Sequence, residues 1–206
     1  MKKLFLLSVL ISFCMMTSCT KEDDTTLQPF NKIIFEENFN NVQDNTVFDL
    51  PGWTNFAQIG SRRFTEQIFS DDGYAEFTSF ASNQAVNVAW LVSPKINMEA
   101  QQGEILTFTT AHSFLTSREN ALEVLVSTNF DGTNVAAADW EAIPATIVSP
   151  DDIRFRKIFS TQLDLSRFKG QLNFAFRVRG SGTNTNLDGT YQIDNVMMFY
   201  KAFEQF

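Results

Sequence analysis

The residue types that usually carry out catalysis are scarce in this chain. Its 206 residues include a single histidine, His112, and two cysteines, Cys14 and Cys19. A Ser-His-Asp or Cys-His mechanism would have to use His112, and the sequence has no G-x-S-x-G turn to present a nucleophile. Glycoside hydrolysis needs two suitably spaced carboxylates, and no E-x-D-x-x-E strand motif is present. We therefore predict a protein that binds rather than catalyses, with His112 as a surface or half-buried side chain.

Composition bounds the class of protein further. The formal net charge is −8 and the sequence pI is about 4.6, which argues against nucleic acid as the main partner. The chain is 44% hydrophobic and 19% charged, as expected for a folded domain. Because 22 of its residues are phenylalanine, we expect a core built largely from aromatic side chains.

The first residues have the pattern of an export signal. Lys2 and Lys3 precede an apolar run of about ten residues, which is too short to span a bilayer. The following Met16-Thr17-Ser18-Cys19 resembles a bacterial lipobox, with Met where Leu is usual. We predict a lipoprotein signal peptide over residues 1–18 and lipidation of Cys19, which anchors the chain to a membrane. The alternative is a plain signal peptide in which Cys19 is incidental.

Residues 19–32 read as a lipidated, flexible tether. The polar segment Thr20-Lys21-Glu22-Asp23-Asp24 resembles the surface-export signal of lipoproteins in the Bacteroidetes phylum. The resemblance implies an outer-membrane protein that faces the cell exterior. Any solvated acidic linker would give the same pattern.

From residue 33 to 201 the pattern predicts short β-strands in one domain. Within residues 170–179, Leu172, Phe174, Phe176 and Val178 alternate with polar side chains, as in a strand with one wet face. Asp-Gly pairs at 72–73, 131–132 and 188–189 are suited to tight turns. The predicted fold is all-β: a single sandwich of two antiparallel sheets, with helical turns only near 136–140 and 166–169.

Several segments, taken in order, resemble a known group of domains. They are Phe35–Phe39, Gly52-Trp53, Ala89–Pro94, Leu122–Thr128 with Asn129–Gly132 and then Trp140, Leu165–Gly170 and Tyr191–Val196. Together they resemble the choice-of-anchor J and cleaved-adhesin group of jelly-roll domains, which is related in shape to MAM and galactose-binding-type sandwiches. The resemblance implies a jelly roll and a role in adhesion or nutrient capture, with a glycan or surface polymer as ligand. The alternative is a structural or protein-interaction lipoprotein that docks onto an envelope complex.

One carboxylate stands in an apolar strand. Asp194 lies between Ile193 and Val196, and an ionised group there needs a cation or strong hydrogen-bond donors. First and last strands commonly pair in jelly rolls of this shape, which would bring Glu37 and Glu36 near Asp194. Oxygen ligands of this kind suit a structural Ca²⁺, with Glu37 preferred over Glu36. The alternative is that Asp194 accepts hydrogen bonds from loop amides or pairs with an arginine.

The remaining candidates concern the ligand. We expect Trp53, Trp90 and Trp140 to pack in the core because all three fall within the family-like segments. The loop aromatics Phe130 and Phe155 are the candidate ligand contacts. Two basic clusters, residues 62–63 and 154–157, are interpreted as solvated faces and ion-pair partners, with contact to an anionic polysaccharide as the alternative.

Overall fold

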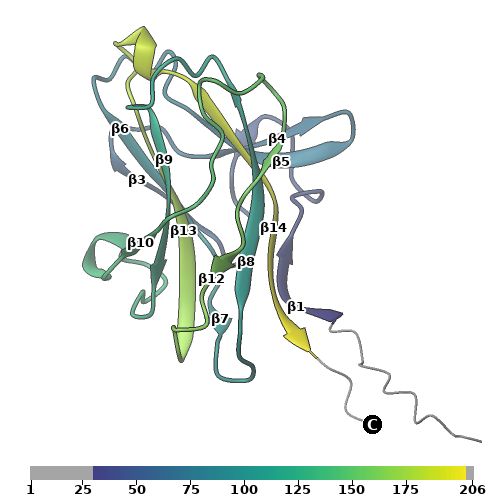
Figure 1. Ribbon diagram of the computed structural model, residues 1–206. Helices are drawn as coiled ribbons and strands as arrows, with labels where there is room; N and C mark the ends of the chain where they lie inside the picture. Colours follow the sequence, from purple (N-terminus) through teal and green to yellow (C-terminus); the bar gives the residue numbers. More distant parts are fainter. Residues whose placement is uncertain (1–29, 203–206) are drawn as a thin grey trace, which may run out of the picture.

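The computed structural model describes residues 30–202, and its regular structure is almost entirely β (Figure 1). The strands are β1 (Phe30–Glu37), β2 (Thr46–Val47), β3 (Thr54–Ile59), β4 (Thr65–Phe69), β5 (Asp72–Thr78), β6 (Asn87–Val92), β7 (Ile96–Asn97), β8 (Ile105–Ser113), β9 (Ala121–Ser127), β10 (Glu141–Ile143), β11 (Ile158–Phe159), β12 (Leu163–Asp164), β13 (Gln171–Gly180) and β14 (Thr190–Ala202). Two single-turn 3-10 helices, η1 (Val135–Ala137) and η2 (Thr185–Leu187), complete the regular structure of this part of the chain. The turn predicted near 136–140 is therefore present, and the one near 166–169 is not helical.

The strands form two antiparallel sheets. Sheet A has the order β11-β8-β14-β5-β4-β2, with β1 also paired to β14 and β12 to β8. Sheet B has the order β10-β9-β13-β6-β3, with β7 also paired to β13. The predicted all-β sandwich of two antiparallel sheets, a jelly roll, is confirmed.

The alternation seen in the sequence explains how the sheets pack. In β13 the side chains of Leu172, Phe174, Phe176 and Val178 are buried in the main core. Phe176 meets Phe108 of β8 edge to face, with ring centroids 5.1 Å apart, so aromatic contacts join the two sheets. The phenylalanine-rich core that the composition predicts is therefore present between the sheets.

The first and last strands lie side by side, as expected. β1 pairs with β14 in a register that runs from Phe30 opposite Ala202 to Glu37 opposite Val196. Both ends of the described chain therefore lie at one end of sheet A, and the β4–β5 hairpin projects near the other (Figure 1). Because β1 begins at Phe30, residues 30–32 belong to the sheet and not to the predicted tether.

A second apolar cluster covers the outer face of sheet B. The loop after β9 folds back over the sheet, and its Phe130 and Trp140 pack on Trp90 of β6. The Trp90 and Trp140 ring centroids are 5.2 Å apart. Trp53 packs instead in the main core, against Phe174 among others. The prediction that all three tryptophans serve packing is confirmed.

The predicted signal peptide (1–18), the lipidated Cys19 and most of the tether lie outside the described residues. Within residues 30–202, the structure contains no helix with the length and apolar character needed to cross a bilayer. Lipidation of Cys19 and outer-membrane localisation stay predictions.

Two buried carboxylates in this fold have opposite surroundings. Glu66 of β4 accepts the backbone N–H of Gln43 at 2.6 Å and of Asp49 at 2.8 Å. Glu104, just before β8, is fully buried, and neither of its carboxylate oxygens has a hydrogen-bond partner within the described chain. A buried polar group without partners is destabilising, whereas a satisfied one holds its donors in place.

We predict opposite effects of the same substitution at these two positions. Glu104→Met should raise the free energy of unfolding by about 1–3 kcal/mol, because it replaces an unpartnered carboxylate by an apolar side chain of similar length. Glu66→Met should lower it by about 2–4 kcal/mol, because two buried N–H groups lose their acceptor. Urea denaturation measures both values. A loss of stability in Glu104→Met would contradict this interpretation.

Candidate ligand-binding face

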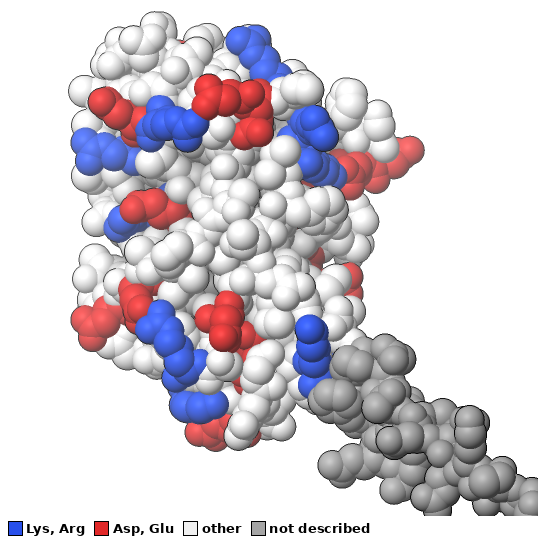
Figure 2. Space-filling model, viewed as in Figure 1, with Lys and Arg blue, Asp and Glu red and all other residues white. Residues whose placement is uncertain are grey.

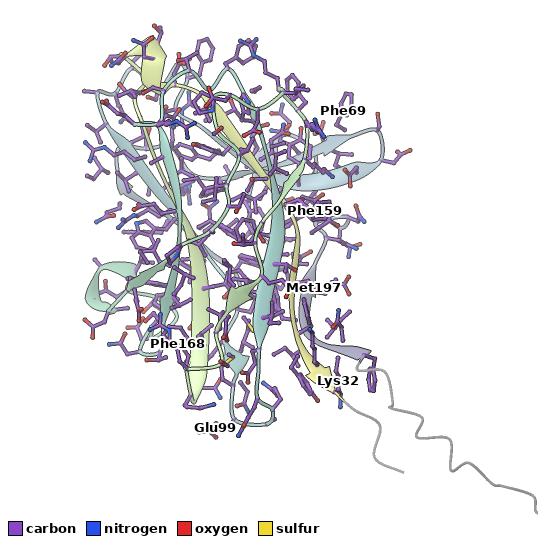
Figure 3. All side chains as sticks on the ribbon, in the orientation of Figure 1. Lys32, Phe69, Glu99, Phe159, Phe168 and Met197 are labelled. Atoms are coloured by element: carbon purple, nitrogen blue, oxygen red, sulfur yellow. The ribbon has the colours of Figure 1, made fainter. Side chains whose placement is uncertain are left out.

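Exposed phenylalanines gather on the outer face of sheet A. Five of them expose between 59% and 78% of their surface around this face: Phe69, Phe80, Phe114, Phe155 and Phe159. Figure 3 shows Phe69 on the β4–β5 hairpin and Phe159 on the strand beside β8. Among residues 30–202, Phe30 is the one other exposed phenylalanine. Exposed aromatic side chains on one face make it a candidate interaction surface.

The floor of this face is polar. In β5 the residues Gly73, Ala75 and Phe77 point into the core, so Tyr74 and Glu76 point outward. Gln192 of β14 lies opposite Glu76 and donates its side-chain N–H to that carboxylate at 3.0 Å. Burial raises the pKa of Glu76 above its usual value, and the bond from Gln192 opposes the shift.

Two hollows open on this floor. The first has a volume of about 410 Å³ and is lined by Thr78, Phe80, Ser113, Phe114, Asp188 and Thr190. The second has a volume of about 310 Å³ and is lined by Phe69, Asp72, Tyr74, Phe155, Lys157 and Gln192. Thr78 and Tyr74 are four residues apart in β5, which places the two hollows about 13 Å apart along the strand. Each hollow has aromatic walls and several polar groups, as small-molecule sites usually do.

Two of the wall residues adopt a backbone conformation that phenylalanine rarely takes. Phe114 has a φ of 57° and Phe155 a φ of 61°. The left-handed region costs a residue with a Cβ about 1 kcal/mol, and glycine avoids that cost. Strained residues of this kind often occur at functional sites. The backbone N–H of Phe155 donates to the carbonyl of His112 at 2.8 Å, which fixes the segment that carries this side chain.

Lys157 joins this segment to the sheet. Its ammonium group bonds the carboxylate of Asp194 in β14 at 2.5 Å and also that of Asp72 in β5. Burial lowers the pKa of Lys157, but its bonds to the two carboxylates outweigh that effect, and the net pKa is raised. Burial is likewise the main influence on Asp194 and raises its pKa.

The expected metal ligands do not come together. Asp194 lies on the outer face of sheet A, where Lys157 and the backbone and side-chain N–H groups of Asn195 satisfy its carboxylate. Glu37 accepts the N–H of Phe39 at 2.9 Å, and Glu36 is exposed. Over residues 30–202 the structure has no group of three histidine, cysteine, aspartate or glutamate side chains that could hold a metal ion. In this structure an ammonium ion and amides satisfy Asp194, and Ca²⁺ binding by Glu37, Glu36 and Asp194 stays a prediction.

The structure places the other candidate residues in different surroundings. Phe155 lines the second hollow as a candidate ligand contact should, whereas Phe130 is 97% buried beneath Trp140 because its loop folds onto sheet B. His112 was expected to be at least half exposed, but it is buried, with Nε2 3.0 Å from the carbonyl of Asp152.

Sequence reasoning missed most of the residues that form this face. Tyr74 and Glu76 could have been found, because residues 72–78 alternate between polar and apolar types. No local signal distinguishes Phe80 or Phe114 from the buried phenylalanines, because both lie just beyond the ends of strands.

The comparisons with known proteins give similarities in overall shape only. No family model and no curated protein matches the chain. Among solved structures, the K1 cleaved adhesin domain of Lys-gingipain from Porphyromonas gingivalis W83 matches with a TM-score of 0.49 at 18% identity, covering 82% of this chain and 98% of that one. The K3 cleaved adhesin domain of the same protein matches with a TM-score of 0.48 at 19% identity, over 82% and 99% of the two chains. TmCBM27, a carbohydrate-binding module with specific mannan recognition, matches with a TM-score of 0.47 at 14% identity, over 84% and 99%. The group that the sequence motifs resemble is thus represented among the matched structures.

We predict that the two partners of the Lys157–Asp194 pair respond unequally to substitution. Lys157→Met should lower the free energy of unfolding by about 2 kcal/mol at pH 7, because it leaves a buried carboxylate without its cation. Asp194→Asn should cost less than about 1 kcal/mol, since the side chain of Lys157 is 37% exposed and keeps Asp72.

The effect of Lys157→Met on stability should depend on pH, because the fold raises the pKa of Asp194. The folded protein binds a proton at Asp194 more tightly than the unfolded chain, and loss of Lys157 would raise the pKa of Asp194 further. The deficit of Lys157→Met relative to the wild type should therefore shrink as the pH falls below 7 into the acidic range, because protonation of Asp194 removes the buried charge that has lost its cation. Urea denaturation at pH 7 and pH 4 measures both effects. An equal deficit at the two pH values would contradict the assignment.

Proposed function

We propose that this chain is a lipid-anchored, surface-displayed module that binds a glycan chain on the outer face of sheet A and catalyses no reaction on it. The observation that carries the proposal is the pair of hollows with exposed phenylalanine walls and a polar floor. The hollows have the volumes of small-ligand sites. Their spacing of about 13 Å along one strand suits an extended ligand better than a single small molecule.

The chemistry of the face fits a sugar chain. Phenylalanine rings offer flat apolar surfaces to the C–H faces of sugar rings, which supply binding energy without strict orientation. The hydroxyls of Thr78 and Ser113, the amide of Gln192 and the carboxylate of Asp188 offer hydrogen-bond donors and acceptors for sugar hydroxyls. These groups lie on strands of the sandwich or at their ends, so the sheet positions them.

The position of the chain ends supports the display of this face. Thr190 at the start of β14 lines the first hollow and Gln192 lines the second, whereas Phe30 pairs with Ala202 at the other end of that strand. An anchor on Cys19 is followed by the 11 residues from 19 to 29, which reach at most about 40 Å. A membrane attached there would lie nearer to the end of the sandwich that is remote from the hollows.

A second candidate function is docking onto an envelope protein through the same face. The observation that favours it is the number of exposed phenylalanines, because five such side chains offer a large apolar area for a protein partner. In that case the partner would be a protein with an apolar surface, and no sugar would be required.

We predict that ligand binding and stability can be separated at Phe114 and Phe155. Replacing either residue with glycine should reduce glycan affinity at least tenfold, because an aromatic wall is lost. The melting temperature should stay within a few degrees of the wild type, because glycine suits a φ near 60° and relieves strain. A polysaccharide panel in affinity gels, followed by calorimetry on each hit, measures the first effect. Phe30→Ala, which removes an exposed phenylalanine outside this face, is the control. Unchanged binding in both glycine variants would contradict the proposed site.

The anchor can be tested separately. An alkyne-labelled fatty acid supplied to the cells should label the wild-type chain and the Cys14→Ser variant, but not Cys19→Ser. Protease added to intact cells should degrade the wild-type protein if it faces outward. Labelling of Cys19→Ser would contradict the lipidation site, and complete protection from protease would contradict surface display.

A further inference from the structure

Two arginines contact the phenylalanines that line the first hollow. Arg62 donates from Nη2 to the carbonyl oxygen of Phe80 at 2.7 Å. The guanidinium carbon of Arg154 lies 4.8 Å from the ring centroid of Phe114. These arginines come from the two basic clusters of the sequence, which are about 90 residues apart, and the fold places each of them against a phenylalanine of the same hollow.

No carboxylate of the described chain occupies the guanidinium group of either arginine, as is also true of several other basic residues of the domain. Within residues 30–202, neither Arg62 nor Arg154 forms a salt bridge. By contrast, Lys157 forms salt bridges with both Asp72 and Asp194, although it lies only three residues after Arg154. A guanidinium group has five N–H donors in a planar fork, so Arg62 and Arg154 keep several donors for a ligand.

The overall charge of the protein does not attract an anionic ligand, so any recognition of negative charge must come from nearby basic side chains. Figure 2 shows Lys and Arg side chains lying among Asp and Glu side chains, with no extended basic area on this side. The chain carries a net charge of −8, which repels an anionic ligand at a distance. Recognition of negative charge therefore depends on short-range contacts. Asp188 lines the first hollow, and the two arginines that contact its phenylalanines carry the opposite charge.

We propose that the first hollow recognises an acidic sugar, that is, a pyranose unit that carries a carboxylate or a sulfate group. This inference rests on the proposed glycan function and names the ligand class. The sugar ring would lie against Phe80 and Phe114. Its anionic group would accept hydrogen bonds from Arg62 or Arg154, and planar guanidinium groups bind such oxyanions in a bidentate manner. Asp188 would accept a hydrogen bond from a sugar hydroxyl and would oppose the anionic group electrostatically.

The test compares acidic and neutral polysaccharides on the same variants of the full chain. The acidic probes are polygalacturonate and chondroitin sulfate, which separate the carboxylate from the sulfate source, and the neutral probes are xylan and mannan. Arg154→Gln and Arg62→Gln should each weaken binding to an acidic probe about tenfold, and Arg154→Lys should give an intermediate loss. Asp188→Asn should tighten the same binding a few-fold, because it removes the opposing charge. Affinity should fall as salt is raised from 50 to 500 mM.

Arg167→Gln is the matched control. Arg167 also stands over a phenylalanine, with its guanidinium carbon 4.4 Å from the ring centroid of Phe168, but it pairs with Glu141 and lies outside both hollows. Its substitution should leave binding unchanged. Melting temperatures of all variants establish that each is folded, which matters most for Arg62→Gln because Arg62 holds a loop carbonyl.

The outcomes separate the inference from the proposed function. Preferential binding of an acidic probe that weakens in Arg154→Gln and tightens in Asp188→Asn supports the inference. Binding of neutral and acidic probes with equal affinity, unchanged in the arginine variants but lost in Phe114→Gly, overturns the acidic-sugar inference and keeps the glycan function. Failure of the wild type to bind any polysaccharide overturns the proposed function and the inference with it.

Discussion

The pairing of β14 with its neighbours is the interaction on which the rest of the molecule depends. Over its 13 residues, β14 pairs with β8 along one edge, and with β5 and then β1 along the other. Its inward side chains, such as Ile193, enter the core, and its outward side chains, Gln192 and Asp194, lie on the outer face of sheet A. Strand β14 therefore lies at the centre of sheet A and contributes residues to the floor of both hollows. It also carries Asp194, which binds Lys157 of the second hollow.

Buried carboxylates show how the domain manages charge. Glu66 is satisfied by backbone amides, Asp194 by an ammonium ion and amides, and Glu104 has no partner within the described chain. The carboxylates of Glu66 and Asp194 connect separate segments of the chain, because a buried carboxylate needs hydrogen-bond donors and these come from neighbouring segments. An ionised Asp194 needs a nearby positive charge, and this need was the argument for Ca²⁺. In this structure the ammonium group of Lys157 supplies a positive charge at Asp194. Ca²⁺ binding itself stays a prediction, and the donors around Asp194 give it no carboxylate cluster.

The strands were predictable from the sequence, and the site was not. Alternation such as that of residues 170–179 reports which face of a strand is buried, and this is enough to indicate two packed sheets. The position of a loop depends on long-range contacts that leave no periodic trace. Phe130 and Phe155 both lie in loops rich in polar residues, yet one is buried on sheet B and the other lines a hollow on sheet A. Lys157 is separated from Asp194 by 37 residues, so their pairing could not be read from either segment alone.

The left-handed backbone at Phe114 and Phe155 has a consequence for how this sequence would drift over time. The side chains of Phe114 and Phe155 are mostly exposed, unlike that of the core residue Phe39, which also has a positive φ, and glycine or asparagine would fit the backbone at positions 114 and 155 better. Selection for stability alone would therefore replace both residues. If the proposed ligand binds this face, a descendant that no longer needed it would lose these two aromatics early, and the residue type at these two positions would record whether a relative still uses the face.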